Sequence, residues 1–352
     1  MPILGHKTYI VIKPKRYRCD KCEDQPATTQ KLDWYTQKSS FTNAYEEYLM
    51  LSLINSTIQD VGIKNDVGPD AIAGILDRHV QAQVNWTKIR SLGVIGIDEI
   101  SMRKGHRDFV VIITACVQER AILLGVLPDR TKATVKQFFL SIPKKLRKTV
   151  KVVCSDLYAG FISAAKEAFG RKAYVCADRF HVTRLYRNGL DSLRKKEMKR
   201  LKKELSADQY KELDKVLWVL RKPFEHLNED ERRTLNLLFK YSPPLRQAYD
   251  LCSALTSIYS SPLSKYHGKH KMRGWIQQVT NSGLTCFNSF VKTLQAHFEE
   301  ITNYFIDRHT SGFVEGINNK IKVLKRRCYG MSDLNRLFQR VWLGLEGYAM
   351  FA

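Results

Sequence analysis

The chain has 352 residues, of which 44% are hydrophobic, so it is long enough to bury a substantial core in two or three domains. Lys and Arg outnumber Asp and Glu by 58 to 35, and the formal net charge of +23 favours a polyanionic partner, with nucleic acid the first expectation. The longest apolar run, residues 109–117, is too short to span a bilayer, and no signal-peptide pattern opens the chain, which indicates a cytoplasmic protein.

Residues 1–40 are expected to form a basic β-hairpin with part of a zinc ribbon. Side chains alternate over residues 7–17, which predicts the hairpin, and a Cys-x-x-Cys pair at Cys19 and Cys22 follows. A structural zinc site needs four ligands, no second pair lies nearby, and His6 is the nearest other candidate. Only half of a zinc site is therefore predicted. The eight cysteines imply no disulfide framework.

Residues 41–90 have apolar positions at helical spacing in three short segments, with a polar, glycine-containing break at 62–69. Three short helices with a tight break predict a helix-turn-helix that binds DNA. Its last helix, residues 69–80, would enter the major groove. A small helical hairpin with no role in DNA binding fits the same pattern.

Residues 91–180 change to a β/α pattern and predict the first part of a catalytic core. The order βββαβαβ is that of a ribonuclease-H-like fold, a mixed sheet covered by helices. The predicted strands are 94–100, 109–117, 121–127, 150–154 and 173–176, and the predicted helices are 133–142 and 160–169.

Residues 181–300 contain no strand pattern and predict an α-helical insertion that interrupts the core. Its dense charge run, residues 194–204, is typical of a solvated helix face, although such a stripe can also follow the phosphates of a nucleic acid. The core is expected to resume in the helices of residues 301–352.

One late helix, residues 312–330, carries a single acidic side chain among cations. Phe313, Ile317, Ile321 and Leu324 recur at helical spacing and should be buried, whereas the opposite face should hold Glu315, Asn319, Lys322 and Arg326. Ser311 or Gly312 would cap the start of this helix, and Gly330 would end it. By itself, Glu315 could equally be an ion-pair partner on a solvated face.

Two aspartates upstream favour a catalytic role for Glu315. Asp98 ends the first predicted strand and Asp156 follows the fourth, so in this fold all three acids should converge at one end of the sheet. Paired Mg²⁺ ions need several shared carboxylates, which tolerate such proximity only when a metal neutralises them. The alternative is that each aspartate caps a strand end or forms a turn.

Four motifs along this core resemble those of the ISL3 family of bacterial insertion-sequence transposases, and the resemblance covers residues 90–350. It implies Asp98, Asp156 and Glu315 as the acidic triad, and Asp178 and His181 as an Asp-x-x-His signature, with Asn319 as a further supporting residue. The motifs are Gly96-Ile-Asp-Glu99, Cys154-Ser-Asp-Leu-Tyr158, Ala177-Asp-Arg-Phe-His-Val182, and Gly312-Phe-Val-Glu-Gly-Ile-Asn-Asn-Lys-Ile-Lys322 followed by Arg326-Arg-Cys-Tyr-Gly330.

The resemblance implies a DNA transposase that binds the terminal inverted repeats of its element, cleaves DNA there and joins the freed 3′-hydroxyls to target DNA. Two Mg²⁺ or Mn²⁺ ions would activate the nucleophile and stabilise the leaving oxygen. The expected working form is a homodimer on DNA in the bacterial nucleoid. Cations of the late helix should bind phosphate rather than bases, namely Lys320, Lys322, Lys325, Arg326 and Arg327.

Two alternatives stay open at the level of sequence. A structure-specific nuclease on the same fold would cleave without joining, and a DNA-binding protein with a vestigial triad would do neither. The ISL3 family usually carries a first Cys-x-x-Cys upstream of the pair at Cys19 and Cys22, and this sequence starts without it. The zinc ribbon is therefore expected to be incomplete.

Overall fold

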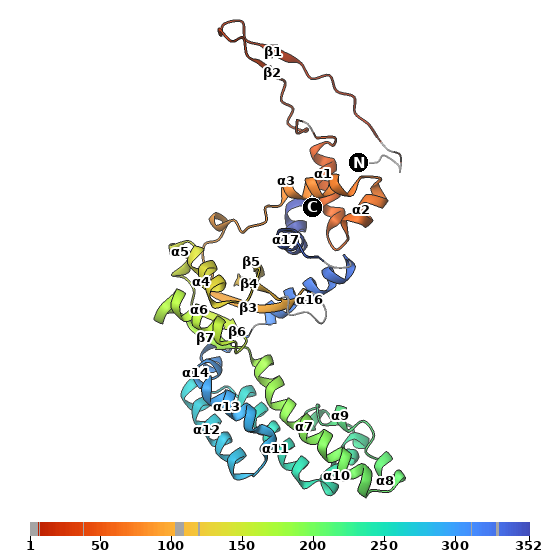
Figure 1. The fold of residues 1–352 in the computed structure, drawn as a ribbon, viewed down its shortest axis with the longest axis vertical. Coiled ribbons are helices and arrows are strands. Elements are labelled where there is room, and N and C mark those ends of the chain that lie inside the picture. The colour runs from red at the N-terminus through yellow and green to blue at the C-terminus, as the bar shows by residue number, and fades with distance from the viewer. Residues whose placement is uncertain are drawn as a thin grey trace.

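The computed structural model describes residues 6, 8–37, 39–102, 109–118, 120–310, 312–328 and 331–352. The molecule is elongated, with a β-sheet near its middle, the helices of residues 43–79 on one side and those of residues 179–296 at the other end (Figure 1). The carboxy-terminal helix lies beside the N-terminal helices (Figure 1). None of the described helices is both long and apolar enough to cross a membrane.

The central sheet is mixed. Its elements in chain order are β3 (Val94–Ser101), β4 (Phe109–Val117), β5 (Arg120–Leu127), α4 (Lys132–Ser141), α5 (Lys144–Arg147), β6 (Val152–Ser155), α6 (Ala159–Phe169), η2 (Gly170–Lys172) and β7 (Tyr174–Ala177). The strand order across the sheet is β5-β4-β3-β6-β7. β3, β4 and β5 are antiparallel neighbours, whereas β6 is parallel to β3 and β7 is parallel to β6. The predicted order of strands and helices is therefore confirmed.

Every helix or strand that the structure describes after β7 is a helix, as the sequence predicted. Aromatic side chains of Tyr186, Tyr259, Trp275 and Phe287 fill the core of this helical segment. Its elements are α7 (Arg179–Glu204), α8 (Ala207–Lys211), α9 (Val216–Val219), η3 (Phe224–His226), α10 (Glu229–Tyr241), α11 (Pro243–Ser260), α12 (Lys265–Asn281), η4 (Thr285–Phe287), α13 (Asn288–Ala296), α14 (Phe298–Thr302) and α15 (Tyr304–Asp307). Two more helices, α16 (Gly312–Arg327) and α17 (Leu334–Phe351), complete the chain, while the expected cap Ser311 and helix end Gly330 lie outside the described residues.

The three helices predicted before the sheet are present. They are α1 (Asn43–Leu53), α2 (Ile58–Asn65) and α3 (Pro69–His79), and a short turn, η1 (Trp86–Lys88), leads to the sheet. The side chains of Thr42 and Thr57 accept hydrogen bonds from backbone N–H groups in the first turns of α1 and α2, as N-caps do. The helices share one apolar core with Leu343 of α17.

The predicted hairpin over residues 7–17 is wrong in position. A hairpin does form, but from β1 (Arg16–Arg18) and β2 (Ala27–Thr29), with the Cys-x-x-Cys pair in the turn between the strands. Residues 8–15 form no strand, and Tyr9 and Val11 are 80% and 87% exposed. Alternation misled here because no second layer covers these apolar side chains, so nothing rewards a pleated strand.

The two faces of the sheet pack on different helices because strand side chains alternate. Ile97 of β3 belongs to the core shared with α4 and α6, whereas Ile100 packs with α16 and α17. Gly96 is on the same face of the sheet as Ile100, and α16 approaches it so closely that a Cβ there would lie 2.1 Å from Val314 Cγ2. The side chain of Asp98 points to this same face and therefore faces α16.

Candidate active site

Three aspartates stand level with one another beside the ends of β6 and β7; Asp156 and Asp178 directly follow those strands, whereas Asp98 lies inside β3, which continues to Ser101 and does not end at Asp98 as predicted. Gly96 is opposite Cys154 in the parallel register of β3 and β6, which puts Asp98 level with Asp156. The register of β6 and β7 in turn puts Asp156 level with Asp178. Neighbouring strands lie about 4.8 Å apart, so the three carboxyl groups form a compact row, which we call the acidic edge.

The Asp98 carboxylate uses both oxygens. Oδ1 accepts a hydrogen bond of 2.8 Å from the backbone N–H of Glu99, and Oδ2 accepts one from the side-chain amide of Asn318 on α16. Burial raises the pKa of Asp98, and the negative charges of Asp178 and Glu99 add to this effect. The fold therefore holds Asp98 in an environment that opposes its ionisation unless a cation is near.

Asp156 is placed in a similar environment with fewer partners. Its Oδ1 accepts a hydrogen bond of 3.1 Å from the backbone N–H of Tyr158. Burial raises the pKa of Asp156, and the charges of Glu99 and Asp98 contribute to the rise while His181 opposes it. The contribution of the Asp98 charge to the raised pKa of Asp156 agrees with the strand register in bringing the two acids together.

Asp178, which is buried, and His181, which is half-buried, form a pair at the start of α7. Asp178, only 6% exposed, caps the helix by accepting a 3.2 Å hydrogen bond from the backbone N–H of Phe180. Its Oδ2 lies 2.9 Å from Nδ1 of His181. This hydrogen bond raises the pKa of His181, with further contributions from the charges of Asp98 and Asp156. The predicted Asp-x-x-His residues thus lie with the two aspartates.

Glu315 lies on the helix that covers β3, but its side chain is exposed. It follows Val314, which packs on Gly96, and precedes Asn318 by one turn. Over the described ranges of the chain, no three His, Cys, Asp or Glu side chains are grouped so that they could hold a metal ion. The structure therefore brings Asp98 and Asp156 together and places Glu315 on the adjoining helix without closing a three-carboxylate site.

Asn318 and the pair formed by Glu99 and Arg130 were not predicted. Arg130 donates hydrogen bonds of 3.3 and 3.1 Å to the carboxylate of Glu99. Its guanidinium carbon lies 5.0 Å from the ring centre of Phe109 and 5.2 Å from that of Tyr158. The adjacent acids Asp98 and Glu99 in a predicted strand could have indicated a role for Glu99. No sequence pattern indicated Arg130.

The buried face of α16 differs by one residue from the predicted stripe. Val314, Ile317, Asn318 and Ile321 are buried, while the predicted supporting residue Asn319 is exposed. The amide that contacts Asp98 is thus the neighbour of the predicted one. Spacings of four and three residues from Val314 to Asn318 to Ile321 could have indicated this face.

Three of the five cations expected to bind phosphate hold α16 in place. Lys320, Lys325 and Arg327 donate to the backbone carbonyls of residues 344, 101 and 55 respectively, and burial lowers the pKa of Lys320. Lys322 and Arg326 are exposed. Lys322 and Arg326 are therefore the two of the five that a phosphate could reach without breaking a contact between α16 and another element, since Arg326 Nε donates only within the helix, to the carbonyl of Lys322.

Of the cysteine pair near the N-terminus, Cys22 is exposed and Cys19 is partly exposed. Their Sγ atoms lie 3.2 Å apart, and the hydrogen bond between them lowers the pKa of Cys19. His6 is also exposed and belongs to no metal-binding group in the part of the chain that the structure describes. The pair is therefore a potential two-thiol ligand set, as predicted, and the zinc site stays a prediction.

Comparison with known proteins defines the class of this site. The model of the ISL3 family of DDE transposases, described as "Transposase", matches residues 95–341, a span that includes the acidic edge and α16. The chain therefore belongs to the ISL3 transposase family and is a DNA transposase.

Relatives agree with this membership. The transposase for insertion sequence element IS1001 of Bordetella parapertussis is 24% identical, over 99% of this chain and 84% of that protein. The transposase for element IS1557 of Mycobacterium tuberculosis is 24% identical over 74% of this chain and 62% of that protein. Among solved structures, the Drosophila P element transposase strand transfer complex aligns over 90% of this chain and 94% of that one, with a TM-score of 0.46 and 10% identity.

Proposed function

We propose that this transposase cleaves DNA at the terminal inverted repeats of a bacterial insertion sequence and joins the freed 3′-hydroxyls to target DNA. We further propose that the sheet and its helices are a ribonuclease-H-like core, with Asp98, Asp156 and Glu315 as its acidic triad. The observation that carries the proposal is the level placement of two half-buried carboxylates on neighbouring strands, with Asp98 in contact with the helix that bears Glu315.

The donor set fits a divalent cation such as Mg²⁺ or Mn²⁺. Carboxylate oxygens are the ligands that such hard cations prefer, and a cation relieves the burial and repulsion that raise the pKa of Asp98 and of Asp156. Asp98 and Asp156 would hold the metal, with Glu315 as the third carboxylate. Two bound ions would supply activation of the attacking oxygen and stabilisation of the leaving 3′-oxygen.

Neighbouring side chains position the acids. The amide of Asn318 holds one oxygen of Asp98 and the backbone of Tyr158 holds one oxygen of Asp156, so each carboxylate keeps another lone pair available. Asp178 orients the ring of His181, which we propose contacts the phosphate of the cleaved strand. Such fixed geometry at strand ends is what transfer of a phosphodiester requires.

Recognition of the DNA ends is proposed for residues 41–90, and backbone contact for Lys322 and Arg326. The exposed surface of α3 carries Asp70, Asp77 and Arg78, and Arg78 already pairs with Glu46. Because α3 offers little free positive charge, we assign the phosphate contacts to other residues and propose α3 for contacts with base edges only. We propose that two copies of the chain act together on the two ends, in the bacterial nucleoid.

Strand-transfer assays test the proposal. A supercoiled plasmid bearing both ends of the element should be cut and joined by the wild type with Mg²⁺, and Asp98→Asn, Asp156→Asn and Glu315→Gln should each lower both rates by roughly a thousandfold or more while the ends stay bound. Asp250→Asn, at an exposed acid on α11, is the matched control and should act as the wild type. Cleavage without joining would instead define a nuclease, and binding with neither reaction a DNA-binding protein.

A further inference from the structure

One face of α7 leads away from the acidic edge and is rich in arginine. The helix begins directly after Asp178, so its first residues adjoin the proposed catalytic residues. One stripe of the helix contains Phe180, Arg184, Arg187 and Arg194, which follow one another at steps of four, three and seven residues. The opposite stripe of α7 is buried in the helical core.

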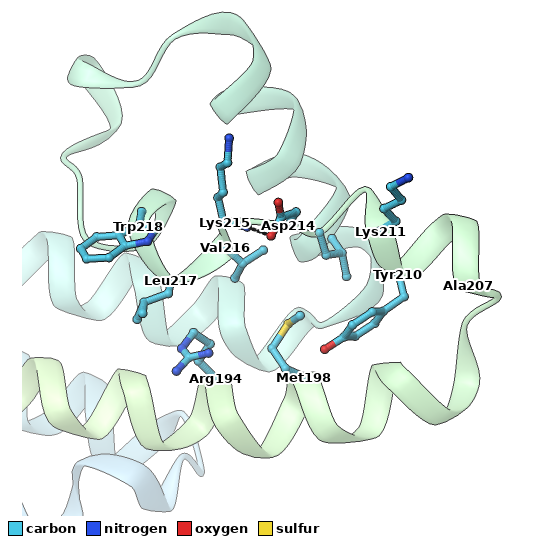
Figure 2. Close-up of a pocket in the computed structure, with 11 residues that line it drawn as sticks. Arg194, Met198, Ala207, Tyr210, Lys211, Asp214, Lys215, Val216, Leu217 and Trp218 are labelled. Carbon is cyan, nitrogen blue, oxygen red and sulfur yellow. Dashed lines mark hydrogen bonds between the residues drawn. The ribbon is translucent and has the colours of Figure 1, made fainter.

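This arginine stripe lines a hollow between α7 and α9. The hollow encloses about 360 Å³, and its far wall includes Leu217, Leu220 and Arg221. A second hollow of about 550 Å³ shares Arg194 and Leu217 with the first, so the two form one continuous surface. Figure 2 shows Arg194 on α7 facing Leu217, with Trp218 beside it. We call this surface the arginine groove.

The charge of the arginine groove is strongly positive. Four arginines line the first hollow, against a single acid, Asp191. Asp191 already pairs with Arg194 at 2.8 Å and with Lys195 at 2.9 Å, so it neutralises little of the remaining charge. Arg184 and Arg221 are exposed. A polyanion would therefore meet free guanidinium groups on both walls.

Two large aromatic side chains stand exposed in and beside the groove. Phe180 is 58% exposed at the end near the acidic edge, and Trp218, on α9, is 60% exposed. The guanidinium carbon of Arg221 lies 5.3 Å from the Trp218 ring centre. Exposed rings interleaved with arginines form the usual surface for unpaired bases, because bases stack on the rings while cations follow the backbone.

We propose that the arginine groove binds a single-stranded segment of DNA next to the cleavage site. This inference rests on the proposed function, since the groove starts at the acidic edge. The leucines between its arginines favour unpaired bases over duplex, because a duplex presents only its phosphates and sugars to such a wall, whereas unpaired bases offer apolar faces. The groove would hold the unpaired strand beside the acidic edge, where cleavage and joining take place.

Binding of a labelled oligo-dT strand and of a labelled duplex of equal length to the full chain tests this inference. Arg184→Gln with Arg221→Gln should weaken oligo-dT binding about tenfold, and should reduce the slope of log affinity against log salt by about 1.4, as loss of two phosphate contacts requires. Phe180→Ala with Trp218→Ala should weaken it about tenfold or more without changing the slope. Duplex affinity should change less than about twofold in both variants.

Matched controls separate the groove from general basicity. Lys199→Gln with Lys203→Gln removes two exposed charges from the same helix outside the groove, and should leave the preference for oligo-dT unchanged. Trp218→Phe keeps a ring and should retain the wild-type affinity, which excludes misfolding as the cause of the alanine effect. Unchanged oligo-dT binding in the groove variants, or equal losses on strand and duplex, would overturn the inference.

The test is independent of catalysis. Asp156→Asn should bind oligo-dT as tightly as the wild type, because the acid lies outside the arginine groove. If Asp156→Asn still cleaved DNA, the proposed catalytic residues would be wrong while the groove result stood. If the groove variants bound oligo-dT normally, the groove would be wrong while the catalytic proposal stood.

Discussion

Asp98 and Asp156 lie level on adjacent strands, but their hydrogen bonds differ. Asp98 accepts bonds at both oxygens, from Glu99 and Asn318, whereas Asp156 accepts one, from Tyr158. An amide has one accepting oxygen, so it can replace Asp156 with no bond lost, whereas at Asp98 both bonds are kept only when the buried Asn318 amide turns over and accepts with its Oδ1, which has no partner among the described residues. The two positions should therefore respond differently to the same substitution.

We expect Asp156→Asn to melt at or above the wild type in the presence of a chelator, while losing DNA cleavage. The raised pKa of Asp156 means that the fold disfavours its charge, and the amide removes that charge while keeping the bond from Tyr158. Thermal unfolding with and without Mg²⁺ measures this, since the variant should also lose the stabilisation that the ion gives.

Asp98→Asn provides the comparison. It should gain less than Asp156→Asn, by at most about 1 kcal/mol, because keeping both hydrogen bonds requires the buried Asn318 amide to turn over. The stability difference between each amide variant and the wild type should also shrink on acidification, since a carboxylate with a raised pKa destabilises the fold only above its usual pKa range. If both variants melted well below the wild type and still cleaved, the two aspartates would be structural caps.

At the scale of elements, the contact between β3 and α16 determines where Glu315 and Asn318 lie. We predict that Gly96→Ala destabilises the chain by about 1 to 3 kcal/mol and abolishes cleavage, because the new methyl group would lie 2.1 Å from Val314 Cγ2 and 2.9 Å from Thr114 Oγ1. The helix would have to move off the strand. Unfolding midpoints and cleavage rates measure both effects.

Gly316→Ala on the same helix is the matched control for Gly96→Ala. No atom lies within 4 Å of the Cβ that it would add, so it should raise stability by about 0.5 to 1 kcal/mol through helix propensity. Val314→Ala combined with Gly96→Ala should restore part of the lost stability by making room. Full cleavage by Gly96→Ala alone would show that the approach of α16 to β3 is not needed for catalysis.

Glu46 joins α1 to α3 through a buried carboxylate. Its side chain is 3% exposed, and it accepts hydrogen bonds from Ser39, Arg78 and His79. Burial alone would raise the pKa of Glu46, but the hydrogen bonds from Arg78, Ser39 and His79 outweigh burial and lower it. The carboxylate therefore stabilises the three-helix cluster when ionised.

Glu46→Gln should cost the cluster about 1 to 2 kcal/mol near neutral pH. A lowered pKa gives stability that is present above the usual carboxyl range and is lost as the pH falls through the folded value, so the difference from the wild type should vanish on acidification. Amide hydrogen exchange of α1 and α3 measures the cluster by itself. Glu47→Gln, at the exposed neighbour, should change nothing, and a difference that grew in acid would refute the assignment.

The packing of α16 also shows where sequence reasoning stops. Periodicity predicted the helix, its basic character and the burial of Ile317 and Ile321, but Phe313 and Leu324 are only partly buried, and the prediction missed Asn318. Asn318 is buried because it meets Asp98, a partner 220 residues away, and because Gly96 leaves space for α16. Neither cause can be read from the local pattern of apolar residues.

For the whole molecule, the succession of strands and helices along the chain was predictable, because apolar runs of strand length alternate with helical stretches from residue 94 onward. The level placement of Asp98 and Asp156 followed from the parallel pairing of their strands. The contacts of the α16 cations were not predictable from the sequence, because Lys320 and Arg327 donate to the carbonyls of Gly344 and Asn55, which only the folded chain brings near.

The last helix, α17, connects the proposed DNA-recognition helices to the catalytic core. Its first half packs on the sheet through Leu337, Phe338 and Val341, and Leu343 in its second half belongs to the core of α1 to α3. The buried Arg340 donates to the carbonyls of Leu53 and Ser56, and burial lowers the pKa of Arg340 to about 10. Recognition and cleavage should therefore depend on each other through α17.

We predict that Leu343→Ala uncouples the two. Leu343 is 1% exposed, so the truncation should loosen α1 to α3 from α17 at a cost of about 2 to 5 kcal/mol, while Leu337 and Val341 keep α17 on the sheet. Binding to the element's ends should stay within a few-fold of the wild type, whereas cleavage at those ends should fall, because bound DNA is no longer held against the acidic edge. Hydrogen exchange, end binding and plasmid cleavage measure the three effects, with Tyr348→Ala, at a residue 61% exposed on the same helix, as the control. Normal cleavage by a chain whose N-terminal helices exchange freely would show that α17 only stabilises the fold and does not transmit the position of the bound DNA.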